Sequence, residues 1–494
     1  MTLTAASTAG ETRVLANFVG GTWTPAANRQ TLEDRDPATG ALLAQIPLST
    51  AADVDAAVVA ARTAAEAWRA TSPIRRARAV IALREVLVAH QQELAELVTR
   101  DMGKTLDDAL AEVGRGIESC EAAIAMPHLL KGENLEGVGT GVDVELIRQP
   151  VGVVAAITPF NFPAMIPLWF LPYAVAAGNA FILKPSEQDP LPGARIVELA
   201  GSVDLFPPGL INLVHGGRDA VEALLDHPGV DAVSFVGSAR TARVVAERAT
   251  ANGKRVQALG GAKNAMVVMP DADPDLLVAG VLASAFGAAG QRCLAGSIAV
   301  LVGTEAEQDA ARDRLLAAAA ELRTGPGADP ATDVCPVVTP QARERIVKEI
   351  EDFEAEGGTV ALDGRGDAGA GSCLLGPTIL DRVPARHRVL EEELFGPVLA
   401  LVRAGDLDEA ITWVNASRYG NASVIFTESG RAARTYKTRV EAGMVGVNVG
   451  VAAPVAWFPF SGWKDSIDGD LHANGRDAVD FYTRKKVVTS RWAA

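Results

Sequence analysis

A run of 35 residues, 149–183, contains no charged side chain. Such a run must avoid water, either inside a membrane or in the interior of a large domain. Prolines and asparagines that do not suit a continuous helix interrupt it: Pro159, Asn161, Pro163, Pro167, Pro172 and Asn179. Because proline removes a helix hydrogen bond, we expect no membrane span here. The run instead predicts a buried strand, 151–157, followed by an irregular loop and a helix.

Strand and helix patterns alternate after this run. Apolar strands are predicted at 180–184, 210–214 and 232–236, with helical segments between them. This alternation predicts an α/β fold in which helices cover both faces of a parallel sheet. It resumes after Gly261, with a strand at 297–302 and a helix at about 305–323. Since 494 residues exceed one typical core, we expect two or three domains.

The N-terminal part is predicted to combine turns and helices. Gly20-Gly21 marks a hairpin turn, and a second turn is expected at 36–40. Three helices are expected: 51–69, capped by Ser49 or Thr50, one that begins with Ser72-Pro73 and ends at Gly103, and 105–126, which stops at Pro127. The glycine-rich segment 363–371 is expected to be a surface loop.

Charge and cysteine usage exclude several classes of protein. A net charge of −15 argues against nucleic acid or an anionic membrane as a partner. The four cysteines show no CxxC spacing and the six histidines no HExxH motif, so we expect no metal site. Residues 1–10 lack the pattern of a signal peptide. We expect a protein of the reducing cytoplasm.

The segment 286–297 indicates a reactive cysteine, Cys293. Small residues around it allow the backbone to approach a substrate closely. Arg292 is its neighbour in sequence, and a nearby cation lowers the pKa of a thiol towards the reactive range. The alternative is a buried structural cysteine, which is common among free cysteines. A second feature, Phe235-Val-Gly-Ser238 before a helix at 239–250, suits a pyrophosphate, although no GxGxxG accompanies it.

Seven motifs carry a resemblance to a known family. They are 157–165 (ITPFNFPAM), 182–187 (ILKPSE), 235–238 (FVGS), 261–264 (GAKN), 290–293 (GQRC), 391–397 (EEELFGP) and 481–485 (FYTRK). In this order they resemble the aldehyde dehydrogenase superfamily over nearly the whole chain. More closely, the chain resembles the CoA-acylating methylmalonate-semialdehyde dehydrogenases.

The resemblance implies an aldehyde dehydrogenase fold of three parts. They are a Rossmann-like NAD-binding domain (1–127 and 148–258), an α/β catalytic domain (259–470) and a β oligomerisation hairpin (128–147 and 471–494). Because such edge strands extend a partner's sheet, a homodimer or homotetramer is expected.

The resemblance also implies roles for individual residues. Cys293 would attack the aldehyde carbon, and Asn161 with the Cys293 N–H would hold the oxyanion, before hydride passes to NAD. The residues that match the family's NAD site are Thr158, Phe160, Lys184, Glu187, Gly237, Ser238, Glu393 and Phe395. The Glu187 carboxylate would repel a 2′-phosphate, which favours NAD over NADP. Without the resemblance, Asn161 would suit a loop turn and Glu393 a solvated acidic run.

The expected fate of the acyl group follows from an absence. Ala258 stands where hydrolytic relatives carry a general-base glutamate, so the thioester should await a better nucleophile, coenzyme A. Arg115 and Arg292 match two arginines that grip a substrate carboxylate in this branch. Arg115 could equally be a solvated helix residue. The expected reaction is oxidation of malonate or methylmalonate semialdehyde to an acyl-CoA, with loss of CO₂ as in the family.

Two other functions stay open. The first is a dehydrogenase of the same superfamily that acts on another aldehyde and releases the free acid. The second is a catalytically inactive structural protein, against which intact Cys293, Asn161 and Glu393 argue. The tail also departs from the branch: Asp468 replaces an arginine, 450–454 replaces a proline-richer run, and Ala265 replaces a histidine. The substrate tunnel and the CoA entrance can differ accordingly.

Overall fold

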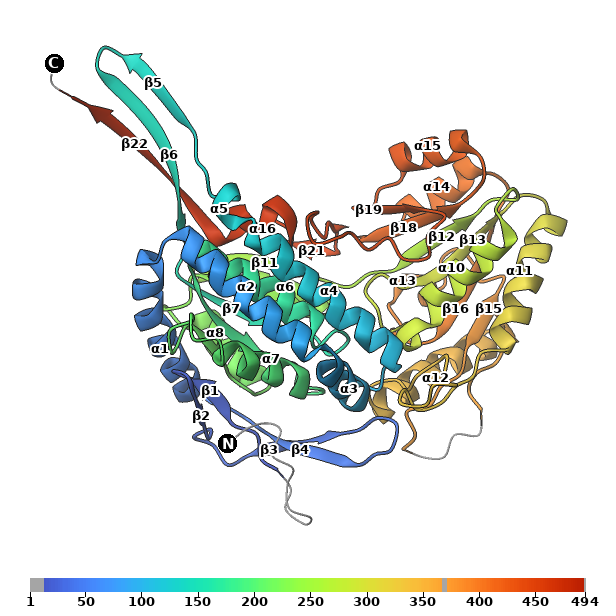
Figure 1. Cartoon of the computed structure of the whole chain (residues 1–494). Coiled ribbons are helices and arrows are strands. Elements are labelled where there is room, and N and C mark those ends of the chain that lie inside the picture. Colours follow the sequence, from blue (N-terminus) through green and yellow to red (C-terminus); the bar gives the residue numbers. More distant parts are fainter. Residues whose placement is uncertain (1–12, 367–370, 493–494) are drawn as a thin grey trace.

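Parallel strands and helices alternate through most of the computed structural model, which describes residues 13–366 and 371–492. Within these residues, two large sheets form the two halves of the body, and a three-stranded arm projects from it (Figure 1). The predicted α/β architecture is therefore confirmed. The expectation for residues 1–10, and part of that for 363–371, falls outside the described residues.

The first sheet is built from the 35-residue uncharged run and its neighbours. Its described strands are, in spatial order, β2 (Thr22–Thr24), β1 (Asn17–Val19), β9 (Ile211–Leu213), β8 (Ala180–Lys184), β7 (Val153–Ile157), β10 (Ala232–Val236), β11 (Arg255–Leu259) and β21 (Ile467–Asp468). The five strands from β9 to β11 are parallel, whereas β1 and β21 are antiparallel to their neighbours in the sheet. β7, β8 and β10 are buried along their whole length, as their apolar sequences predict.

The strand order places a topological switch point between β7 and β10. From β7 the chain proceeds through β8 to β9 on one side, and then returns to β10 and β11 on the other. In register, Ile157 pairs with both Phe235 and Lys184, so the segments after β7, β8 and β10 leave the sheet at one edge. Ligands of open α/β sheets bind at the carboxyl ends of the strands at such a point. The fold therefore provides a nucleotide-binding edge.

Helices pack around the first sheet. They are α1 (Ala51–Ala70), α2 (Pro73–Ala89), α3 (Gln91–Met102), α4 (Leu106–Ile124), α5 (Met126–Leu129), α6 (Met165–Ala177), α7 (Leu191–Gly201), α8 (Arg218–Asp226), α9 (Ala239–Ala251) and α16 (Gly475–Tyr482). Thr50 and Ser72 occupy N-cap positions as predicted, and Thr105 and Ser238 are the N-caps of α4 and α9. The hairpin turn at Gly20-Gly21 is also confirmed, and the second turn joins β3 (Thr31–Arg35) to β4 (Leu42–Pro47).

Two predicted helices were wrong in extent. The single helix expected up to Gly103 is divided at His90, whose backbone (φ −113°, ψ 14°) leaves the helical region while its Nδ1 lies 2.8 Å from the Val86 carbonyl. The helix expected to run to Met126 ends at Ile124. Pro127 does not terminate a helix but lies in the first turn of α5, where a missing N–H is tolerated.

The second sheet carries the segment that contains Cys293. Its described strands are, in spatial order, β14 (Thr359–Leu362), β15 (Thr378–Asp381), β16 (Val398–Ala404), β13 (Gly296–Val302), β12 (Asn264–Val268), β18 (Ala422–Phe426) and β19 (Met444–Val447). All neighbouring pairs are parallel except β14 with β15. Around it lie α10 (Pro274–Phe286), η1 (Gly287–Gly290), α11 (Glu305–Ala320), α12 (Pro340–Ala355), α13 (Arg388–Glu391), α14 (Leu407–Asn415) and α15 (Gly430–Arg439). A short pair, β17 (Tyr419–Gly420) with β20 (Trp463–Lys464), lies outside both large sheets.

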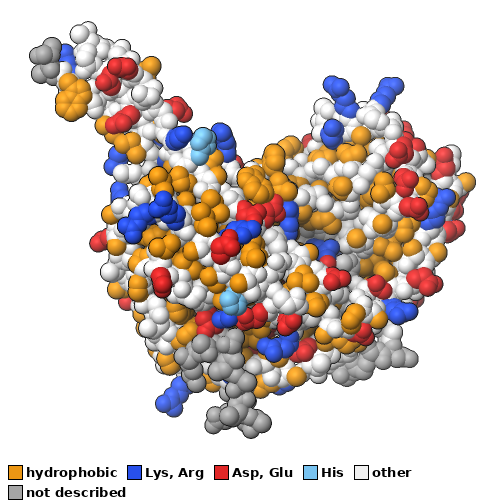
Figure 2. All heavy atoms as spheres, in the orientation of Figure 1, with side chains coloured by type: hydrophobic (Ala, Val, Ile, Leu, Met, Phe, Trp, Pro, Cys, Tyr) orange, Lys and Arg blue, Asp and Glu red, His pale blue; other side chains and the backbone are white. Residues whose placement is uncertain are grey.

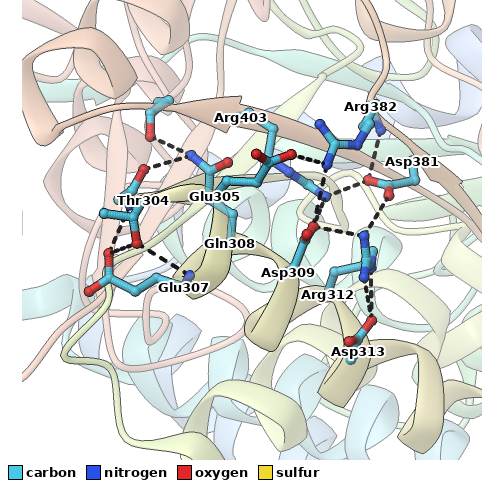
Figure 3. Close-up of polar contacts among 12 residues, drawn as sticks. Thr304, Glu305, Glu307, Gln308, Asp309, Arg312, Asp313, Asp381, Arg382 and Arg403 are labelled. Carbon is cyan, nitrogen blue, oxygen red and sulfur yellow. Dashed lines mark hydrogen bonds and ion pairs between the residues drawn. The ribbon is translucent and has the colours of Figure 1, made fainter.

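A charged network fastens α11 to the strands beneath it. Asp309 and Asp381 alternate with three arginines, and Arg403 Nη2 lies 2.8 Å from Asp381 Oδ1 (Figure 3). At the start of α11, Thr304 and Glu307 form a capping box. The network joins α11 to β15 and β16 by ion pairs. It lies apart from the contacts of Cys293 described below.

The arm consists of three antiparallel strands. They are β5 (Asn134–Gly139), β6 (Val142–Pro150) and β22 (Thr483–Arg491), and β6 pairs with β22 over nine residues. Figure 2 shows the arm standing out from the body with hydrophobic side chains along it. Leu135, Val487 and Trp492 expose 65%, 64% and 75% of their surface. Such an exposed apolar edge is unusual for a monomer.

Candidate active site

Cys293 lies just before β13, at the amino ends of the second sheet's strands. The turn that precedes it is strained, because Ala288 and Ala289 have φ values of +50° and +53°. Two buried amides hold the cysteine backbone: Asn264 Nδ2 donates to the Cys293 carbonyl at 2.8 Å and Asn421 Nδ2 at 2.9 Å. These asparagines open the adjacent strands β12 and β18. The sheet edge therefore fixes the position of the cysteine backbone.

Asn161 reaches the same turn from the first sheet. It lies in the loop between β7 and α6, is almost fully buried, and donates from Nδ2 to the Gln291 carbonyl at 3.0 Å. The structure thus brings Asn161 to within two residues of Cys293, as the predicted pairing of these residues requires. A neutral amide donor beside a cysteine can stabilise a developing oxyanion.

The expected effect of Arg292 on Cys293 was wrong. Arg292 Nη2 donates to Asp108 Oδ1 at 2.6 Å and its Nη1 to the Ala283 carbonyl, so its charge is compensated by a carboxylate. Burial and the nearby Glu393 carboxylate raise the pKa of Cys293 to about 12, against the lowering effects of backbone N–H groups and of Lys104. Adjacency in sequence did not place the Arg292 guanidinium where it acts on the thiol.

Arg115 and Asp108, the partner of Arg292, lie on the same face of α4. Asp108, the partner of Arg292, and Arg115 are seven residues apart, which corresponds to about two helical turns on one face. Arg115 Nη1 pairs with Glu118 at 2.5 Å and its Nη2 with the Pro454 carbonyl at 2.5 Å. Each arginine therefore has a carboxylate partner on α4, and Arg115 is not simply a solvated helix residue.

The predicted nucleotide-binding residues gather at the carboxyl edge of the first sheet. Thr158 follows β7, Lys184 ends β8, and Gly237 and Ser238 follow β10 on either side of the switch point. Ser238 caps α9 by accepting the Thr241 N–H, so the first-turn N–H groups of α9 face this edge. The Thr158 hydroxyl is buried and has no hydrogen-bond partner among the described residues.

Lys184 and Glu187 form an ion pair at this edge. Lys184 Nζ lies 2.8 Å from Glu187 Oε2. Burial alone would raise the pKa of Glu187, but the Lys184 ammonium and its hydrogen bond outweigh burial and hold the pKa below its ordinary value. Glu187 is therefore an anion at neutral pH, with a carboxylate directed by its lysine partner.

Glu393, Phe395 and Phe160 connect the two halves of the site. The Glu393 carboxylate accepts the Ala262 N–H at 3.3 Å, and burial raises its pKa to about 7 despite that hydrogen bond and Lys263. Phe395 has a positive φ of 54° and packs edge-to-face against Phe160, with ring centroids 5.6 Å apart. A small pocket borders Arg292, Glu393 and Phe395.

Ala258 is enclosed within the first sheet. It lies on β11, is fully buried, and pairs in register with Phe235 and Asp468. The carboxylate of Asp468 binds Arg243 of α9 at 2.8 Å, so its charge is paired. The site thus has no carboxylate at position 258. The carboxylate of Asp468, which pairs in register with Ala258, is bound to Arg243.

Sequence reasoning missed several residues that organise the site. Lys104 and Glu112 form a pair behind Asn161, Asp108 holds Arg292, and Asn421 holds Cys293. Asn264 was noticed only as part of a motif. The sequence predicted the helix 105–126, which corresponds to α4. No local signal pointed to the partners of these side chains, because each contact joins segments that are distant in sequence.

The described residues contain neither a metal-binding cluster nor a membrane-spanning helix. No group of three or more histidine, cysteine or acidic side chains there is arranged to hold a metal ion. None of the helices in the described ranges has both the length and the apolar character needed to cross a membrane.

Comparison with known proteins agrees with this geometry. The model of the aldehyde dehydrogenase family matches residues 23–488. A malonate-semialdehyde dehydrogenase from Geobacillus kaustophilus is 48% identical over 485 residues, which cover 98% of each chain. A second, from Geobacillus thermodenitrificans, is 47% identical and covers 97% of this chain and 99% of its own.

Solved structures show the same architecture. A protein from Sinorhizobium meliloti, named as a methylmalonate-semialdehyde dehydrogenase and complexed with NAD, superposes with a TM-score of 0.96 at 43% identity, covering 98% of this chain and 99% of its own. The methylmalonate-semialdehyde dehydrogenase from Oceanimonas doudoroffii gives a TM-score of 0.95 at the same identity and coverage.

Proposed function

Since the chain belongs to the aldehyde dehydrogenase family, we propose that it oxidises malonate or methylmalonate semialdehyde with NAD and transfers the acyl group to coenzyme A. The observation that carries this proposal is that side chains from both halves donate hydrogen bonds to the turn that contains Cys293. Asn264 and Asn421 hold the Cys293 backbone from one sheet, while Asn161 reaches Gln291 from the other. The substrate follows from relatives of 47–48% identity along nearly the full chain.

The first step is attack by the Cys293 thiolate on the aldehyde carbon. A C–S bond forms, the carbonyl π bond breaks, and its electron pair becomes an oxyanion that the Asn161 amide and the Cys293 N–H stabilise. One N–H of the Asn161 amide donates to Gln291 in the free protein, and its second N–H is available to the substrate oxygen. The oxyanion then returns its electron pair to carbon as hydride leaves, which produces a thioester on Cys293.

The residues at the switch point fit a dinucleotide. The unpartnered Thr158 hydroxyl offers a hydrogen bond, and the N-terminus of α9 offers N–H groups to a pyrophosphate. A Cβ at Gly237 would lie 2.5 Å from the Phe235 ring, so only glycine fits this turn. When bound, NAD supplies the nicotinamide that accepts the hydride. Lys184 and Glu187 would hold the adenosine ribose, and Glu393, Phe395 and Phe160 the nicotinamide end.

The substrate carboxylate is assigned to Arg115 and Arg292. Each guanidinium is paired with one protein carboxylate, Glu118 or Asp108, and a guanidinium group has five N–H donors, so each can also contact a substrate anion. A substrate anion would share or replace these partners in a bidentate geometry. Aldehydes without a carboxylate should gain nothing from either arginine.

Release of the acyl group depends on coenzyme A. Ala258 offers no base to activate water, and Asp468 is bound to Arg243. The CoA thiolate attacks the thioester carbon, forms a new C–S bond and expels the Cys293 thiolate. As in the family, loss of CO₂ from the malonyl-type group precedes this transfer. The C–C bond to the carboxylate breaks, its electron pair stays on the α-carbon, and that carbon takes up a proton from solvent, so acetyl-CoA or propionyl-CoA would result.

A second candidate function is release of the free acid. The observation that favours it is Glu393, an enclosed carboxyl whose pKa of about 7 suits a general base and which acts on Cys293 electrostatically. Glu393 would then activate water in place of the absent glutamate at 258. Both candidates use the same thioester and differ only in its acceptor.

The exposed arm supports assembly into a homodimer or homotetramer. β5 exposes its whole length, and an edge strand of this kind can pair with the sheet of a second copy. Sedimentation or light scattering of the wild-type protein, compared with a Leu135→Lys and Val487→Lys double variant, tests whether the arm assembles copies.

The deciding experiment is a substrate panel followed by NADH absorbance. Malonate semialdehyde, methylmalonate semialdehyde and propanal are each supplied with NAD, with and without CoA. We expect sustained NADH formation with the two carboxylate-bearing aldehydes and CoA, accompanied by equal acyl-CoA. Equal turnover without CoA would favour free-acid release through Glu393, and no NADH from any aldehyde would indicate a structural role.

A further inference from the structure

A buried cation lies behind the oxyanion loop. Lys104 joins α3 to α4, directly after Gly103, and only 1% of its side chain is exposed. Its Nζ lies 2.6 Å from the Asn161 carbonyl and 2.5 Å from Glu112 Oε2. The ammonium also stands over the Phe162 ring, 3.8 Å from its centroid. A lysine is almost never enclosed in this way unless it is paired.

Glu112 secures the other end of the same loop. Its Oε1 accepts the N–H groups of Ala164 at 2.8 Å and Met165 at 3.0 Å. The ion pair therefore holds the loop from 161 to 165 at both ends, with the cation at Asn161 and the anion at Met165. Because the Glu112 carboxylate accepts two backbone N–H groups at the far end of the loop, the Lys104 ammonium is the end of the pair that contacts Asn161.

The site needs a cation that Arg292 does not supply. The Cys293 thiolate and the oxyanion are both negative, and the Glu393 carboxylate nearby disfavours them. Arg292 and Lys104 are each paired with a carboxylate, Asp108 and Glu112 respectively, but Lys104 has the larger effect on the pKa of Cys293. Lys104 lowers the pKa of this thiol, by less than the backbone N–H groups of Cys293 and Leu294 do, and together with Arg292 it lowers the pKa of the buried Cys335.

We propose that Lys104 is a positioning residue for the reaction: its ammonium fixes the Asn161 backbone and provides the positive field that favours the Cys293 thiolate and the developing oxyanion. This inference rests on the proposed nucleophile but not on the substrate or on CoA. The groups that face Lys104 are Glu112, Asp189, Cys335 and Cys293, together with the Asn161 carbonyl. Loss of its charge should leave the thiol harder to ionise.

Alkylation of Cys293 by iodoacetamide tests the charge without any substrate. The reagent is neutral, and only the thiolate reacts, so the rate at a fixed pH below the thiol pKa follows the thiolate fraction. Rates between pH 6 and 10 are followed by mass spectrometry of the peptide that contains Cys293, in the absence of NAD. Lys104→Met with Glu112→Gln removes both charges and keeps an acceptor for Ala164 and Met165. Lys104→Gln with Glu112→Gln is a second neutral design in case the first fails to fold, and Lys104→Arg is the matched charged control.

We expect the neutral variants to react at least about tenfold more slowly at pH 8, which corresponds to a rise of about one unit in the pKa of the thiol. Their pH profiles should move upward by the same amount, while Lys104→Arg stays within about threefold of wild type. Neutral variants that melt cooperatively and keep the wild-type rate within twofold would overturn the proposal. A Lys104→Arg variant as slow as the neutral ones would also overturn it, because shape rather than charge would then matter. Failure of the substrate panel would leave this result unaffected.

Discussion

The Arg292 guanidinium binds Asp108, a residue 184 positions away, although Arg292 is the covalent neighbour of Cys293. The same Asp108 carboxylate accepts the Ala288 N–H at 3.1 Å, within the strained turn that leads to the cysteine. One side chain of α4 therefore holds both the proposed substrate-binding arginine and the backbone before the proposed nucleophile. Figure 1 shows α4 extending from the first-sheet half towards the second, which makes this contact possible.

Replacement of the proposed nucleophile should abolish NADH formation and leave NAD binding unchanged. Cys293→Ala is expected to remove NADH formation, because no thioester can form, while the dissociation constant for NAD stays near its wild-type value. NADH absorbance and calorimetric titration measure the two properties. Cys373→Ala, which changes a buried cysteine elsewhere in the second half, is the matched control and should remain active. Turnover by Cys293→Ala above a trace would exclude the covalent mechanism.

Removal of Arg115 should act selectively on substrates that carry a carboxylate. Loss of a desolvated charge pair costs about 2–5 kcal/mol, so Arg115→Leu should lower kcat/KM for malonate semialdehyde by roughly ten- to a thousandfold or more. The loss for propanal should be small. Arg78→Leu, an exposed change on α2, is the control. Equal losses for both aldehydes would mean that Arg115 acts through its contacts with Glu118 and Pro454 alone.

The Lys184–Glu187 pair should select NAD over NADP. The Glu187 carboxylate is ionised at neutral pH, and a 2′-phosphate would meet a like charge. We expect kcat/KM for NAD to exceed that for NADP by at least about tenfold, and Glu187→Gln to narrow this ratio. Initial rates with each cofactor at saturating aldehyde provide the measurement. Comparable efficiencies in the wild-type enzyme would contradict the assignment of Glu187.

Without CoA the enzyme should produce one equivalent of NADH and then slow down. A general base typically contributes about 10²–10⁴-fold, and the site lacks one at Ala258. Stopped-flow absorbance should show a stoichiometric burst, and mass spectrometry an acyl adduct on Cys293. With CoA, turnover should be sustained and acyl-CoA should appear in step with NADH. Steady release of free acid without CoA, with no adduct on Cys293, would refute this prediction.

Glu393 should destabilise the protein above neutral pH. Its pKa in the folded state, about 7, lies above the ordinary value of about 4.5. Between these values the folded state binds more protons than the unfolded state, so the contribution of this group to stability falls as the pH rises through that window. Glu393→Gln removes the charge and should raise the Tm at pH 8 by on the order of 1–3 °C.

The comparison of two pH values isolates this effect. At pH 5 Glu393 is already protonated in the folded protein, so Glu393→Gln should leave the Tm nearly unchanged. Differential scanning calorimetry without NAD measures both values. Glu391→Gln, an exposed change two residues earlier, is the control and should show no such difference. An equal Tm shift at pH 5 and pH 8 would show that ionisation of Glu393 is not responsible.

Much of the fold could be predicted because its signals are local. The uncharged run, the alternation of strands and helices, the Gly20-Gly21 turn and the N-cap at Ser72 each depend on residues close together in sequence. The family motifs likewise placed Cys293 and Asn161 in the right order. The division at His90 was missed because the apolar stripe continues through it, although the backbone does not.

The sequence by itself determined which residues are proposed to carry the chemistry, and the tertiary structure alone decided which of them contact one another. Cys293, Asn161 and Lys184 could be identified from motifs, but the choice of Asp108 as the partner of Arg292 could not. The contacts that define the site join residues far apart: 57 positions for Lys104 with Asn161, 128 for Asn421 with Cys293, and 184 for Arg292 with Asp108. A side chain selects its partner by distance and burial in the folded chain, and neither is a property of its neighbours in sequence.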